Sequence, residues 1–116
     1  MAITGTVNSL GILDQRVLTT TNATTLVTVP ASTVYNKIKL TLSNTSATLN
    51  AVVDIYLVPS GGTAGVSNCI YPQVLVTLNT YAEAEIPHDL TAGYFVAVKS
   101  DTANIITAQL SANSLT

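Results

Sequence analysis

The chain has 116 residues, and only ten of them are charged, while threonine occupies nineteen positions and valine thirteen. Its charged fraction of 9% lies well below the roughly 25% of an ordinary soluble domain. This length allows one domain, and the four scattered basic residues argue against nucleic-acid binding, which needs clustered lysine and arginine. Most surface positions must therefore hold small uncharged polar groups, which indicates a subunit of an assembly more than an enzyme.

Residues 1–15 show a weak apolar pattern, in which Ile3, Leu10 and Ile12 are spaced among glycines and an asparagine. This pattern suits an extended arm that reaches a neighbour better than a packed strand. We therefore predict an N-terminal arm over residues 1–15 and one β-sandwich domain over residues 16–116. The first residues contain neither a basic stretch nor a long apolar run, and Cys69 is a lone cysteine, so we expect a protein kept in a reducing cytoplasm.

From Arg16 onward, runs of β-branched residues end at Gly, Pro, Asn, Asp or Ser, which is typical of strands. The expected strands are residues 16–20, 24–29, 34–43, 49–58, 70–79, 81–86, 94–99 and 104–111. No helix is long enough for a parallel crossover, and the only helix candidate is one turn at residues 88–92. The sequence therefore predicts an all-β fold of about eight strands, an antiparallel β-sandwich or jelly roll.

Alternation predicts which side chains of three strands point into the core, because successive residues of a strand face opposite sides. The expected inward residues are Ile38, Leu40 and Leu42, then Val53, Ile55 and Leu57, then Val74, Val76 and Leu78. Tyr56 has the opposite parity in its strand, so we expect it to be the most exposed tyrosine.

Two segments are expected to become ordered only against a partner. Residues 59–68 form the longest loop, and its three glycines lack the lysine or following helix that a phosphate cradle needs. Residues 111–116, at the C-terminal end, should fray or dock on a partner.

The residue types that usually perform catalysis are few. The single histidine, His88, stands beside Asp89, whose side chain should point away from it; a dyad with Cys69 stays an alternative, although Cys69 enters a strand and suits a small buried position. Glu83 and Glu85 share one face of a strand, a spacing that suits paired carboxylates, a calcium ion or a solvated face. We favour the solvated face, and we predict no catalytic residue, cofactor or metal.

Five tyrosines and one phenylalanine make up the aromatic content, and tyrosine is favoured at protein interfaces and sugar-binding surfaces. The absence of tryptophan argues against a carbohydrate-binding platform. The residues that we predict at an interface are Ile3, Leu10, Ile12, Tyr56, Tyr81 and Tyr94.

Three motifs carry a resemblance to a known group of proteins. They are Leu-Val-Thr-Val-Pro-Ala from Leu26, Lys-Ile-Lys-Leu-Thr-Leu-Ser-Asn from Lys37, and Leu-Thr-Ala-Gly from Leu90, which leads into Tyr-Phe-Val-Ala-Val-Lys. Over residues 24–110 the sequence resembles small β-sandwich structural proteins of tailed-bacteriophage virions. Tyr94 stands where that group often has an aspartate. The resemblance implies a capsid decoration, cement or related virion role.

The expected function is a non-enzymatic virion structural protein. Its most favoured form is a capsid decoration or cement subunit that self-associates, with a trimer as the symmetry implied by the resemblance, and docks on the major capsid protein or another virion protein. One alternative is a tail, fibre or baseplate component, and another is a carbohydrate-binding or adhesin module. We expect assembly into the virion in the host cytoplasm, without a nucleic-acid or membrane partner, because no apolar run approaches the roughly 20 residues of a membrane span.

Overall fold

The structure is a computed structural model that describes residues 7–115, with the side chains of residues 11–115. Eight strands build the described part, together with one short 3-10 turn and no α-helix. They are β1 (Val7–Val17), β2 (Thr24–Thr28), β3 (Val34–Asn44), β4 (Ala51–Val58), β5 (Cys69–Val76), β6 (Tyr81–Ile86), β7 (Phe95–Ser100) and β8 (Ile106–Leu115), and the turn is η1 (Val66–Asn68).

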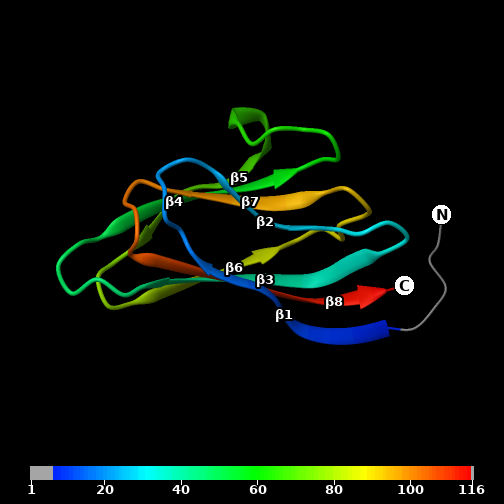
Figure 1. Cartoon of the computed structure of the whole chain (residues 1–116), viewed down its shortest axis with the longest axis horizontal. Coiled ribbons are helices and arrows are strands. Elements are labelled where there is room, and N and C mark those ends of the chain that lie inside the picture. Colours follow the sequence, from blue (N-terminus) through cyan, green and yellow to red (C-terminus); the bar gives the residue numbers. More distant parts are fainter. Residues whose placement is uncertain (1–6, 116) are drawn as a thin grey trace.

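The strands form two packed sheets (Figure 1). Sheet A has the order β1-β8-β3-β6 and sheet B the order β2-β7-β4-β5, and all neighbours are antiparallel. The predicted all-β, antiparallel β-sandwich of about eight strands is therefore confirmed.

The core lies between the sheets, and strand alternation fills it as expected. Ile38, Leu40 and Leu42 of β3 are at most 2% exposed, and Val53 and Ile55 of β4 are fully buried. Strand β8 alternates strictly between buried and half-buried residues, because it is a central strand with one face on the core.

The predicted N-terminal arm is wrong over residues 7–15. Strand β1 pairs along β8 from Val7 opposite Leu115 to Val17 opposite Thr107. Two register shifts interrupt this pairing, at Ser9/Gly11 and at Ile12/Asp14. Each shift changes which face the next residues occupy, so the apolar positions do not alternate in the sequence. Residues 1–6, including Ile3, lie outside the described residues.

The predicted loose C-terminal segment is also wrong over residues 111–115. These residues belong to β8, which lies between β1 and β3. Ala112 and Ser114 point inward and are 5% and 3% exposed, while Ser111 and Asn113 are half-buried. Such small residues alternate without looking apolar, so the sequence pattern predicted the strand only over residues 104–111 and missed its continuation. Residue 116 lies outside the described part.

The helical turn expected at residues 88–92 does not form. Leu90 instead makes an isolated bridge with Tyr35, in which each backbone N–H donates to the carbonyl of the other at 2.9 Å. Leu90 is 1% exposed, so burying its side chain accompanies this extended bridge. The short helical turn that does form, η1, is closed by the N–H of Asn68 donating to the carbonyl of Gly65 at 3.1 Å.

Candidate interaction surface

One end of the sandwich exposes apolar side chains from four neighbouring segments. The structure describes seven exposed large apolar residues, and four of them are here: Leu49 (51% exposed), Leu75 (56%), Leu78 (39%) and Tyr81 (66%). We call these four residues the apolar end. It comprises the β3–β4 loop, the end of β5, the β5–β6 turn and the start of β6, at the left of Figure 1.

Amide groups, not charges, hold the loops of the apolar end together. The Asn44 side chain is 3% exposed, and its Nδ2 donates to the carbonyls of Leu49 at 2.9 Å and Val76 at 3.0 Å. The N–H of Leu78 donates to Oδ1 of Asn50 at 3.0 Å. Residues 44–51 and 74–82 contain no charged side chain. Leu75 points outward from sheet B, and Tyr81, with the parity of Glu83 and Glu85, points outward from sheet A, so the apolar side chains lie on both sides of this end. Several exposed apolar side chains at one end without charge favour a protein interaction site.

The residues predicted at an interface lie in different places. Tyr81 belongs to the apolar end, and Ile12 is 55% exposed on the edge strand β1. Tyr94 is half-buried and packs against the main core. Leu10 lies in β1, with its side chain outside the described part, and Ile3 is outside it entirely.

Sequence reasoning missed the other three residues of the apolar end. Leu75 stands between the inward residues Val74 and Val76 of β5, so the alternation already indicated that its side chain points outward. Leu78 was expected in the core, but β5 ends at Val76 and Leu78 lies beyond the strand. Leu49 precedes β4, which begins at Ala51.

The prediction that Tyr56 is exposed is wrong. Its side chain points away from the main core, as its parity requires, yet it is only 8% exposed. It belongs to a second cluster on the outer face of sheet B, which we call the outer cluster. The members of the outer cluster are Tyr56, Val58 and Ala97, with Ala64, Cys69 and Phe95 packed against them.

The loop of residues 59–68 covers the outer cluster, so it is ordered by its own chain and not only by a neighbour. Figure 1 shows it above sheet B. The N–H of Gly62 donates to the carbonyl of Pro59 at 2.9 Å, and Nδ2 of Asn68 donates to the carbonyl of Thr63 at 2.8 Å. Gly93, at φ +86°, packs directly against Ser60 at the start of this loop.

Glu83 and Glu85 lie on the outer face of sheet A, as expected for a solvated face. Both are exposed, while Ala82 and Ala84 of the same strand pack against the core. Oε2 of Glu83 accepts from Nζ of Lys39 at 2.9 Å, and this hydrogen bond and the charge of Glu83 raise the pKa of Lys39.

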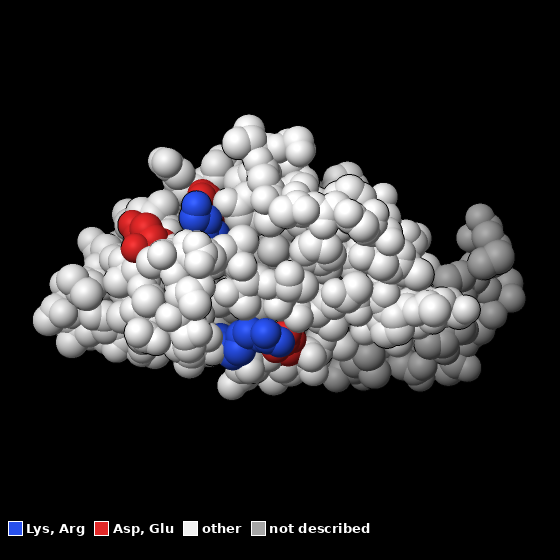
Figure 2. All heavy atoms as spheres, turned by 45° about the horizontal axis from the view of Figure 1, so that its top comes forward, with Lys and Arg blue, Asp and Glu red and all other residues white. Residues whose placement is uncertain are grey.

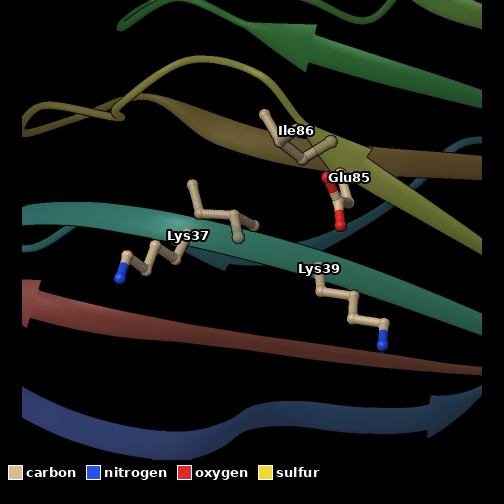
Figure 3. A pocket seen from close by; sticks show the side chains of 5 residues that line it. Lys37, Lys39, Glu85 and Ile86 are labelled. Carbon is tan, nitrogen blue, oxygen red and sulfur yellow. The ribbon is translucent and has the colours of Figure 1, made fainter.

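A shallow hollow of about 280 Å³ lies beside this pair (Figure 3). Lys37 and Lys39 reach it from β3, and Glu85 and Ile86 from β6. Within the described residues, no group of three or more His, Cys, Asp or Glu side chains is placed to hold a metal ion.

The two residues of the alternative dyad have different environments. His88 is exposed, whereas Cys69 is half-buried against the outer cluster, and no hydrogen bond joins them in the described part. Burial raises the pKa of the Cys69 thiol, and the charge of Asp54 adds to this effect. A raised pKa disfavours the thiolate, which is the nucleophilic form. This environment gives no support to a Cys69–His88 dyad.

No protein-family model matches this chain, and no curated protein is significantly similar to it in sequence. Among the described residues, no helix is both long and apolar enough to cross a membrane.

Proposed function

We propose that this chain is a non-enzymatic structural subunit of a tailed-phage virion, a capsid decoration or cement protein that self-associates and docks on the major capsid protein. The observation that carries this proposal is the apolar end, where three leucines and a tyrosine are exposed on loops and strand ends without charge. A free monomer would leave this surface in water, whereas a neighbouring subunit or a capsid would bury it.

The strand order supports a more specific fold for this role. β1 pairs with β8, β2 with β7, β3 with β6 and β4 with β5, as in a long antiparallel hairpin that is wrapped into two sheets. We propose that the sandwich is a jelly roll, an architecture used by viral capsid domains and by lectins. Because one fold serves many functions, the surface and not the fold carries the functional argument.

Attachment to the capsid would come from burying the apolar side chains of the apolar end, repeated in many subunits. One apolar end makes a modest contact, but subunits that also hold each other bind a lattice with avidity. Charge pairs take no part in this surface, so attachment should hold at high salt, which screens ionic interfaces. A tail, fibre or baseplate component would use the same surface, and the location of density for this chain in a particle distinguishes these roles.

The test is sedimentation of the full chain at micromolar concentration, alone and with capsids that lack it. We expect an oligomer that pellets with the capsids. Replacing Leu75 and Leu78 together by glutamate should weaken both associations and leave the midpoint of thermal unfolding nearly unchanged, because both residues are exposed.

The matched control is Val66→Glu, which places the same charge on a side chain that is 99% exposed in η1, away from the apolar end. It should associate like the wild type. A wild-type monomer that stays in the supernatant with every capsid would contradict the proposal.

A further inference from the structure

The outer face of sheet B has two adjoining hollows that share Asp54 and Gln73. The first measures about 330 Å³ and is also lined by Lys99 and Asp101. The second measures about 370 Å³ and is also lined by Val66 and Pro72. Both are open surface hollows, with volumes at the lower end of the roughly 300–1,000 Å³ of small-molecule sites. We call the pair the Asp54 hollow.

A β-bulge shapes the Asp54 hollow. Between the pairs Val53/Val74 and Ile55/Tyr71, the single residue Asp54 faces two residues of β5, Pro72 and Gln73. Gln73 has a φ of +53°, and its N–H donates to Oδ1 of Asp54 at 2.7 Å. The carboxylate is thus fixed by the backbone at the centre of the hollow. Strained bulges of this kind are frequent beside functional sites.

Lys99 brings a positive charge to the Asp54 hollow, and this charge is not paired with a carboxylate of the described residues. Lys99 is directly opposite Asp54 in the pairing of β4 with β7, yet it is exposed and forms no ion pair within the described residues. Asp101 is fixed like Asp54, since its Oδ1 accepts from the N–H of Val52 at 2.9 Å. An ammonium donor and two anchored carboxylate acceptors therefore line one small space.

This combination selects a class of ligand. An anion would meet two carboxylates, and a cation would meet Lys99, so neither is matched by the whole site. A pair of neighbouring hydroxyl groups can donate to a carboxylate and accept from an ammonium at the same time. Val66, which is 99% exposed, and Pro72 offer an apolar wall to the C–H face of a sugar ring. We propose that the Asp54 hollow binds a neutral saccharide, independently of the proposed virion role.

The test is an NMR titration of the full ¹⁵N-labelled chain with the methyl glycosides of glucose, galactose and mannose, each added separately. We expect at least one glycoside to shift the amide signals of Asp54, Gln73 and Lys99 with millimolar affinity. Lys99→Met should weaken this binding about tenfold, the loss typical of a hydrogen bond to a charged group. Asp54→Asn should also weaken it, while the amide oxygen can still accept from the Gln73 N–H.

The matched control is Lys39→Met on sheet A, which removes a lysine that is already paired with Glu83. It should bind the glycoside like the wild type. The proposal is overturned if none of the three glycosides shifts these signals, if Lys99→Met keeps the wild-type affinity, or if glycine or inorganic phosphate binds there and the glycosides do not.

Discussion

The two outer faces of the sandwich each carry a lysine beside a carboxylate, but only one of these lysines forms an ion pair. On sheet A, Lys39 reaches Glu83 at 2.9 Å, and the face is a solvated surface. On sheet B, Lys99 stands opposite Asp54 without an ion pair among the described residues, and the N–H of Gln73 in the bulge donates to the carboxylate. Figure 2, with the sheet B side turned forward, shows charged atoms only in small separate patches on an otherwise uncharged face. Lys37 of β3 is also exposed without an ion pair among the described residues, so the two backbone-anchored carboxylates beside Lys99 are what distinguish sheet B.

The faces also differ in their packing, and Tyr56→Ala tests this difference with the largest expected effect. Tyr56 is 8% exposed in the outer cluster, so its truncation should leave a cavity and lower the free energy of unfolding by about 3 kcal/mol. Chemical denaturation measures this value. Tyr81→Ala, at a position that is 66% exposed, is the control and should cost less than about 0.5 kcal/mol. Equal losses would mean that residues 59–68 do not cover sheet B.

Gly93→Ala tests how that loop is held. A Cβ on Gly93 would lie 2.6 Å from Cβ of Ser60, and the φ of +86° is strained for alanine. We expect a loss of about 2 kcal/mol in unfolding free energy, measured by the same denaturation. Adding Ser60→Gly should recover part of this loss by removing the contact. If the double variant is no more stable than Gly93→Ala alone, backbone strain and not the contact with Ser60 sets the cost.

Alkaline pH should destabilise the protein through the outer cluster on sheet B, which contains Cys69 and Tyr56. Burial raises the pKa of Cys69 above its ordinary 9.0 and that of Tyr56 above its ordinary 10.0. Because the folded chain disfavours the deprotonated forms, their contribution to stability is complete below the ordinary values and is lost as pH rises through the raised values. The thermal midpoint should therefore fall above pH 9.0. Cys69→Ala should delay the fall, and an identical profile in that variant would contradict this assignment.

The smallest effect is expected on sheet A. Lys39 and Glu83 are both 44% exposed in their side chains, so solvent screens their ion pair. Glu83→Gln should shift the thermal midpoint less than any change above, and less still at high salt. Glu85→Gln, on the same face without that bond, is the control. A large drop confined to Glu83→Gln would show that sheet A depends on this pair.

Local alternation was sufficient to predict most strands, because parity is visible where a strand has one buried face, as in β3 with Ile38, Leu40 and Leu42. Bulges hid parts of β1 and β5, and small side chains hid the end of β8. β1 contains two register shifts, and Pro72 and Gln73 together face Asp54, so in both places parity breaks without any signal in composition.

The apolar end and the outer cluster could not be predicted, because they are formed by residues that are far apart in the sequence. In the apolar end, the Asn44 amide connects the carbonyl of Leu49 to that of Val76, and this role as a buried amide cannot be read from its neighbours in sequence. Parity correctly placed Tyr56 on the outer side of sheet B. It did not predict that residues 59–68 would fold back over that side.

The pairing of Val7 with Leu115 has a practical consequence. The first described residue of β1 and the last of β8 meet at the right of Figure 1, far from the apolar end at its left. If the apolar end binds the capsid, a peptide fused near the start of β1 or near the end of β8 would project outward from the particle. Such fusions would make the protein a platform for displaying two foreign epitopes side by side.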